Sequence, residues 1–114
     1  MDWSKPTTQM LGRFQPWHEG HQALFKRAHA KTGQVIVMVR STNEFMTTKQ
    51  VIENIYENLK KDYDTETFEI LEVPNIVNIT YGRDVGYKIE QERLDADIEA
   101  ISATKIRDEI LQTR

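Results

Sequence analysis

Two histidines, His18 and His21, are the residues of this chain whose type and spacing point most directly to chemistry. They lie in residues 12–21, where a predicted strand leads into a predicted helix, and a helix N-terminus presents free N–H groups to anions. Imidazoles donate hydrogen bonds and can carry positive charge where negative charge builds up. Gly20 and Gly12 leave the backbone open to a phosphate because glycine has no side chain. The pattern therefore predicts a phosphoryl-transfer site at this junction.

A second segment with phosphate-binding chemistry lies near the end of the chain, at residues 101–107. The hydroxyls of Ser102 and Thr104, the free N–H groups of a first helical turn, and the cations Lys105 and Arg107 together suit an anion. Read alone, the segment is equally typical of a helix cap followed by a solvated basic turn. Two such helix starts in one small chain are a much stronger signal than either one.

The elements that must position these segments alternate along the chain. Predicted strands span residues 7–12, 35–39, 68–73 and 75–81, and predicted helices span 20–32, 51–63 and the residues after 102. Residues 87–93 are compatible with a strand or a helical turn. Alternating strands and helices favour a parallel α/β sheet with right-handed crossovers. Ligands of such sheets bind at the carboxyl ends of the strands, which is where the histidines are expected.

Composition limits the possible classes of protein. The 114 residues fit one domain, 1–114, in which residues 1–6 are expected to form a flexible arm. A net charge of −3 gives no basic field for nucleic acid or an anionic membrane. The chain has no cysteine, which excludes disulfides and thiolate metal sites, and its longest apolar run, 35–39, is too short to cross a bilayer. We expect a cytoplasmic protein without nucleic-acid or membrane partners.

The two phosphate-binding segments also carry a resemblance to a known family. Gly12-Arg-Phe-Gln-Pro-Trp-His-Glu-Gly-His21 resembles the HxGH signature of the nucleotidylyltransferase superfamily, and Ile101-Ser-Ala-Thr-Lys-Ile-Arg107 resembles its ISSTxxR signature. The Arg-Phe-Gln-Pro sequence is most similar to archaeal-type nicotinamide mononucleotide adenylyltransferases. Ser41-Thr-Asn-Glu-Phe45 is instead similar to a motif of the glycerol-3-phosphate cytidylyltransferases. One departure is Ala103, which stands where many members have a hydroxyl.

The resemblance implies a Rossmann-like, doubly wound parallel sheet and a nucleotidyl transfer. In that reaction a nucleoside monophosphate passes from a nucleoside triphosphate to a small phosphorylated acceptor, and pyrophosphate leaves. It implies Mg²⁺ or another divalent ion bound mainly through the nucleotide phosphates, with no metal site in the protein itself. We expect AMP transfer from ATP. The alternatives are CTP as the donor and a non-catalytic nucleotide-binding module on the same fold. Self-association as a homodimer is left open.

The site residues follow from the matched motifs. His18 and His21 would bind the triphosphate and stabilise charge at the reacting phosphorus, together with Arg107 as the third catalytic residue. The predicted nucleotide-binding residues are Gly12, Arg13, Phe14, Gly20, Ser102, Thr104 and Lys105. A zinc site built from the two histidines and a carboxylate is a weaker alternative, since a turn containing glycine suits phosphate better than a tetrahedral ion.

Several other polar and aromatic residues have ordinary structural interpretations. His29 is expected on the helix surface, and Arg83 and Asp84 are expected to pair and close a turn. Trp17 is expected either to pack, to shield the site or to stack on a base. The acidic residues between 90 and 99 are expected to form a solvated face.

Overall fold

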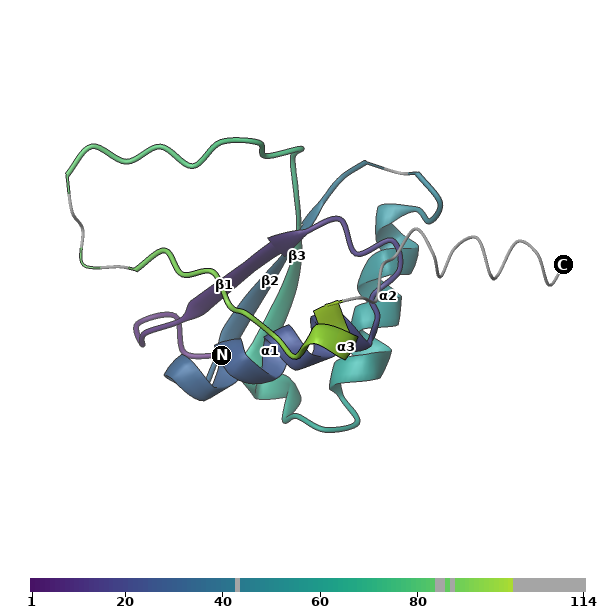
Figure 1. Ribbon diagram of the computed structural model, residues 1–114, viewed down its shortest axis with the longest axis horizontal. Helices are drawn as coiled ribbons and strands as arrows, with labels where there is room; N and C mark the ends of the chain where they lie inside the picture. The colour runs from purple at the N-terminus through teal and green to yellow at the C-terminus, as the bar shows by residue number, and fades with distance from the viewer. Residues whose placement is uncertain (43, 84–85, 87, 100–114) are drawn as a thin grey trace, which may run out of the picture.

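A three-stranded parallel sheet forms the centre of this computed structural model, which describes residues 1–42, 44–83, 86 and 88–99 (Figure 1). The strands are β1 (Thr8–Gly12), β2 (Val35–Arg40) and β3 (Phe68–Val73), in the order β1-β2-β3. The helices α1 (Glu19–Thr32) and α2 (Thr48–Leu59) connect them, and a 3₁₀ turn, η1 (Thr65–Thr67), precedes β3. The predicted α/β class and parallel sheet are confirmed.

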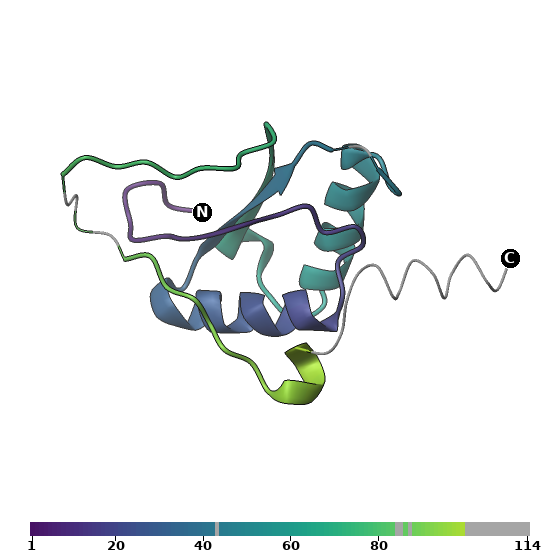
Figure 2. The ribbon, with the colours of Figure 1, turned by 45° about the horizontal axis from the view of Figure 1, so that its top comes forward.

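Both long helices pack against the same face of the sheet. Val35, Val37 and Val39 point to this face and are fully buried, as expected for a strand whose side chains alternate between two faces. The core that they form with α1 and α2 contains Met10, Phe25, Ala28, Val51, Ile55, Leu59 and Phe68. Figure 2 shows α1 running beneath the strands. Val51, Ile55 and Leu59 recur every four residues along α2, which places them on the one face of the helix that packs against the sheet.

The opposite face of the sheet has no helix over it within the described residues. Ile36 and Met38 are only half-buried there, and Leu71, the partner of Met38 in the register, is 37% exposed. A doubly wound sheet carries helices on both faces. The described residues thus contain one layer of helices, and their strand order does not reverse.

The first residues of the chain, whose flexibility stays a prediction, make hydrogen bonds to Gln34 just before β2 and to Glu69 in β3. Gln34 accepts a hydrogen bond from the Asp2 N–H at 3.1 Å and donates one to the Asp2 carbonyl at 2.7 Å. Trp3 Nε1 donates to Glu69 Oε1 at 3.2 Å. Glu69 is in register with Ile36, whose side chain lies on the face that the helices leave uncovered. The N-terminal residues therefore cross that face near the beginning of β2 and β3.

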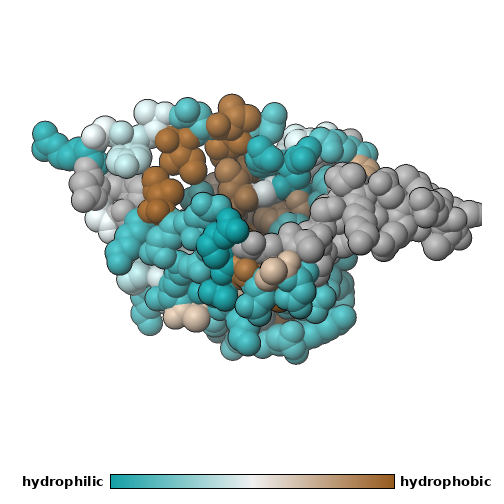
Figure 3. All heavy atoms as spheres, in the orientation of Figure 1, coloured by the Kyte–Doolittle hydropathy of each residue, from teal (hydrophilic) through white to brown (hydrophobic). Residues whose placement is uncertain are grey.

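The predicted strand over residues 75–81 is wrong. This segment is extended, but it pairs with no strand among the described residues, and Val77 is 82% exposed. Alternating apolar residues favour a strand only where a neighbouring backbone supplies hydrogen bonds, and here the chain swings away from the sheet (Figures 1 and 2). Figure 3 shows hydrophobic side chains gathered at the surface near the end of β3 and along this segment.

The chain then returns to the outer side of α1. Lys31 Nζ lies 2.5 Å from carboxylate oxygens of both Glu90 and Glu92, and Arg27 Nη1 lies 3.6 Å from Glu92. These are surface ion pairs, since the Glu90 side chain is 45% exposed, so the two glutamates lie on a solvent-exposed face while they pair with the cations of α1. A short helix, α3 (Ala96–Glu99), follows beside α1. No helix in the described part of the chain has the length and apolar character to cross a membrane.

Candidate active site

His18 and His21 are fixed by reciprocal hydrogen bonds at the first turn of α1. His18 is the N-cap residue, and its Nδ1 accepts a hydrogen bond from the Gly20 N–H at 3.0 Å. His21 Nδ1 accepts one from the His18 N–H at 3.1 Å. The two imidazole rings stack with their centroids 3.8 Å apart and their planes inclined by 22°. The structure thus brings the two predicted histidines together at the carboxyl end of β1.

These hydrogen bonds also determine which nitrogen of each imidazole ring carries the hydrogen. A nitrogen that accepts a hydrogen bond carries no proton, so each neutral ring keeps its hydrogen on Nε2. Burial lowers the pKa of His18, and burial together with the neighbouring His18 lowers the pKa of His21 to about 3. At neutral pH the free protein therefore presents two neutral N–H donors. The positive charge that sequence reasoning allowed for these rings is not present.

Gly20 makes room for the His18 ring. A Cβ atom at position 20 would lie 2.8 Å from His18 Cε1 and 3.1 Å from its Nδ1. At Gly12, a Cβ atom would lie 2.8 Å from two ring carbons of Phe14. At both glycines the 2.8 Å distance is too short for a real contact of a Cβ atom. The space that sequence reasoning assigned to a phosphate is thus used first by the protein's own rings.

Phe14 and Trp17 support His21 from behind. Phe14 has a φ angle of 52°, and its buried ring meets the His21 ring edge-on, with centroids 4.9 Å apart. Trp17 is 6% exposed, lies 5.3 Å from the His21 ring and donates from Nε1 to Gln22 Oε1 at 2.8 Å. Of the three roles considered for Trp17, packing fits this burial, whereas stacking on a base does not. Phe14, predicted as a nucleotide-binding residue, contacts the protein through its ring.

Gln15 joins the β1–α1 loop to the β2–α2 loop. Its side chain is buried, with Oε1 accepting from the Met46 N–H at 2.7 Å and Nε2 donating to the Met46 carbonyl at 3.0 Å. Nearby, Arg13 Nη1 pairs with Glu44 Oε1 at 3.0 Å. Sequence reasoning missed Gln15 and Glu44 as parts of the site, because no local pattern shows that residues 31 positions apart will meet.

His29 is not a surface residue, contrary to our expectation. Its ring packs against Phe25 and Tyr63, with centroids 5.8 and 4.9 Å away, and its Nε2 is buried without a hydrogen-bond partner among the described residues. The reason is that α2 ends at Leu59, earlier than predicted, and the turn after it lays Tyr63 over α1. In the described part of the chain, no three His, Asp or Glu side chains converge as metal ligands.

The second predicted motif, with Ser102, Thr104, Lys105 and Arg107, lies outside the described residues, as does Asp84. The structure does describe α3, the segment that precedes this motif in the chain. The carbonyl oxygen of Ile98 lies 3.6 Å from the position that a Cβ atom of Gly20 would occupy. The chain leading to the second motif therefore passes directly beside the histidine turn.

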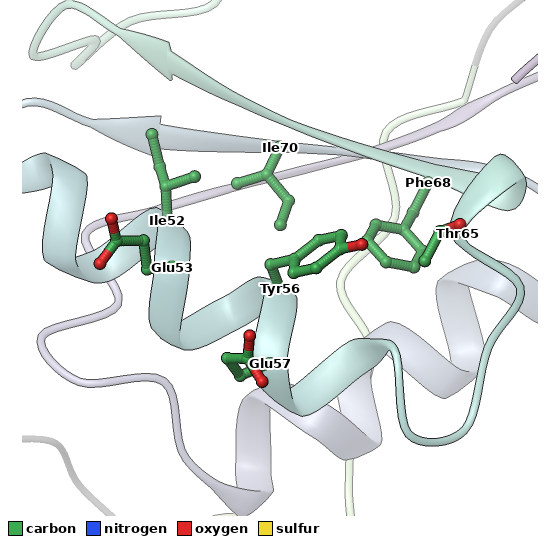
Figure 4. A pocket seen from close by; sticks show the side chains of 7 residues that line it. All are labelled: Ile52, Glu53, Tyr56, Glu57, Thr65, Phe68 and Ile70. Carbon is green, nitrogen blue, oxygen red and sulfur yellow. The ribbon is translucent and has the colours of Figure 1, made fainter.

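A surface groove lies apart from the histidines. It has a volume of about 360 Å³ and runs between α2 and β3, lined by Ile52, Glu53, Tyr56, Glu57, Thr65, Phe68 and Ile70. Figure 4 shows Ile52 and Ile70 facing each other at one end and Tyr56 beside Phe68 at the other. None of the predicted site residues lines this groove.

A family model matches part of the chain. Residues 10–61 match the model of the cytidylyltransferase-like family. The matched segment runs from β1 to just beyond α2 and contains both histidines, Gln15 and the loop that Gln15 holds. No match is found among curated proteins. The match covers fewer than half of the 114 residues, and it shows that residues 10–61 are similar to the cytidylyltransferase-like family.

Proposed function

We propose that the protein transfers a nucleoside monophosphate, AMP in preference to CMP, from a nucleoside triphosphate to a small phosphorylated acceptor. The observation that carries the proposal is the pair of stacked, neutral imidazoles at the N-terminus of α1, whose Nε2–H groups are left for a ligand. Their place at the carboxyl end of β1 is where ligands of parallel α/β sheets bind. The cytidylyltransferase-like match over this segment supports the same class of reaction.

In this reaction an oxygen of the acceptor's phosphate attacks the α-phosphorus, the bond from that phosphorus to the bridging oxygen breaks, and pyrophosphate leaves. The donors His18 and His21 would hold the α-phosphoryl oxygens as charge builds up on them. Because backbone hydrogen bonds already orient both rings, little reorganisation is needed when the transition state forms. The positive end of the α1 dipole adds a favourable field for the phosphates.

A divalent ion on the nucleotide fits this site only through the phosphates. Both histidine Nδ1 atoms accept hydrogen bonds from the backbone, and Glu44 is paired with Arg13, so these groups do not form a cage for a metal. Mg²⁺ characteristically keeps several waters and takes much of its coordination from substrate phosphates. When bound, the ion would neutralise charge on the leaving pyrophosphate.

The second motif would hold the β- and γ-phosphates. In the sequence Ser102 follows Ile98 by four residues, and the Ile98 carbonyl oxygen is beside the histidine turn. Thr104, Lys105 and Arg107 follow on the same segment. Arg13 would contact a phosphate at the entrance.

The choice of ATP over CTP depends on Arg13. This arginine lies inside the histidine motif, where a change of residue alters the phosphate geometry directly. Ser41-Thr-Asn-Glu-Phe45 favours CTP instead, but Asn43 departs from the acidic residue of that pattern. Competition between equal ATP and CTP, followed by mass spectrometry of the nucleotidyl product, decides between them. An excess of cytidylyl product would reverse the choice.

The decisive experiment compares two substitutions of one histidine. In His21→Asn the side chain keeps an acceptor near the position of Nδ1 but loses the Nε2–H donor. In His21→Gln the side chain keeps a donor near the position of Nε2 but loses the acceptor for the His18 N–H. We expect His21→Asn to lower the rate of pyrophosphate release about a hundredfold or more, and to weaken triphosphate binding much less, because the donor acts mainly in the transition state. His21→Gln should retain more activity.

Arg27→Lys is the matched control, since Arg27 is on the outer side of α1 and pairs with Glu92. It should behave as the wild type. A normal rate in His21→Asn would refute the proposed role of the imidazole. Tight triphosphate binding without product from any phosphorylated acceptor would favour a non-catalytic nucleotide-binding module.

A further inference from the structure

A strap of chain, residues 90–99, runs along the outer side of α1 from the last turn of that helix to the first (Figures 1 and 2). It ends in α3, which contacts α1. The Ile98 carbonyl oxygen lies 3.6 Å from the position that a Cβ atom of Gly20 would occupy. The second predicted motif follows α3 in the sequence. The end of the strap therefore sets the point from which the chain approaches the histidine turn.

The beginning of the strap is held by Lys31, in the last turn of α1. Its Nζ lies 2.5 Å from carboxylate oxygens of both Glu90 and Glu92. The Lys31 side chain is 31% exposed and the Glu92 side chain 21%, so the contact between them is partly shielded from water. Attraction between charges is stronger where water is displaced. One cation of α1 thus binds two carboxylates of the strap.

The strap has little slack between this contact and the histidine turn. At about 1.5 Å per residue, Lys31 is about 16 Å along the helix axis from Gly20. The chain from Glu92 to Ile98 reaches about 20 Å when it is fully extended, and α3 uses part of that length in a compact turn. A helix of 4 residues is much too short to be stable by itself. The place of α3 therefore depends on the contacts that hold the strap.

Partly exposed ion pairs add little to the free energy of unfolding of a whole protein. They have a larger effect on the place of a short segment that has few other contacts. We propose that Lys31 is a positioning residue for the triphosphate. Through Glu90 and Glu92 it holds the strap, so that α3 stays against the histidine turn and the second motif reaches the β- and γ-phosphates. This inference rests on the proposed function and deepens it, since it gives a residue at the opposite end of α1 a role in triphosphate binding.

The first measurement follows the place of α3 in the full chain without any nucleotide. Because the chain has no cysteine, Asp97→Cys at an exposed position of α3 provides a single site for a nitroxide label. The label should broaden the amide NMR signals of Gly20 and His21. In Lys31→Met, which has a side chain of similar length without the charge, this broadening should be largely lost, whereas Lys31→Arg should retain it. Unchanged broadening in Lys31→Met would overturn the proposal.

The second measurement is the binding of ATP with magnesium. Lys31→Met should raise the dissociation constant about threefold, and the double variant Glu90→Gln, Glu92→Gln should do the same, because either change removes the same ion pairs. The KM for ATP should rise and kcat at saturating ATP should stay near the wild-type value, since both histidines remain in place. Lys26→Met is the matched control, because it removes an exposed cation of α1 that has no ion pair among the described residues, and it should bind as the wild type does.

The outcomes separate this inference from the proposed function. Equal dissociation constants in Lys31→Met and Lys26→Met would overturn the positioning role even where the wild type binds ATP. A lower urea midpoint in Lys31→Met with an unchanged KM would give Lys31 a structural role only, and would overturn the proposal as well. Failure of the wild type to bind ATP would refute the proposed function, while the nitroxide measurement would still decide whether Lys31 holds α3.

Discussion

The acid sensitivity that His21 confers on the fold can be calculated from its environment. In the folded protein burial and the His18 ring hold the pKa of His21 at about 3, whereas its ordinary value is 6.5. Between these values the unfolded chain binds one proton more than the folded protein, so the free energy of unfolding falls as the pH falls. The contribution is fully present above pH 6.5 and is lost progressively down to about pH 3. From pH 7 to pH 5 the expected loss is about 2 kcal/mol.

The comparison with His21→Asn isolates this contribution from the carboxylates, which titrate in both proteins. Urea unfolding is followed by tryptophan fluorescence, for which the buried Trp17 is a suitable reporter. The wild type should lose about 2 kcal/mol more than His21→Asn between pH 7 and pH 5. At pH 7 His21→Asn should be less stable than the wild type, because it loses the ring contacts with Phe14 and Trp17, so the test compares the change with pH and not the absolute stability. An equal loss in both proteins would show that the His21 ring takes up its proton as in the unfolded chain, and would refute the burial of a neutral ring at this position.

Three further substitutions test the packing around the site. Gly20→Ala should push the His18 ring out of its cap, because the new Cβ would lie 2.8 Å from Cε1, and should cost about 1 kcal/mol in urea unfolding; an unchanged stability would contradict the cap geometry. Gln15→Ala should leave the Met46 N–H and carbonyl unpaired and cost about 1–3 kcal/mol, with faster amide exchange at Met46 as the local check. Ile55→Ala should cost about 2–5 kcal/mol in thermal or urea unfolding, and a loss below 1 kcal/mol would be inconsistent with its complete burial.

The local pattern of the sequence was sufficient to predict the strands and helices of the matched segment, residues 10–61. The continuous apolar residues 35–39 and the four-residue spacing in α2 predicted elements that the structure contains, because burial against a sheet imposes these periodicities directly. The same reasoning failed at residues 75–81, where a strand was predicted. A strand depends on a partner backbone as well as on its own side chains, and local sequence does not reveal whether one is available.

For the site, the sequence by itself determined that two histidines and two glycines stand at the start of a helix after a strand. Only the tertiary structure decided that the rings stack, that each Nδ1 accepts a backbone hydrogen bond, and that burial keeps both rings neutral. It also brought Gln15 to Met46 and left Nε of Arg40 buried without a hydrogen-bond partner among the described residues. Charge state and long-range pairing depend on which atoms share a desolvated space, and that is set by how the strands and helices pack together.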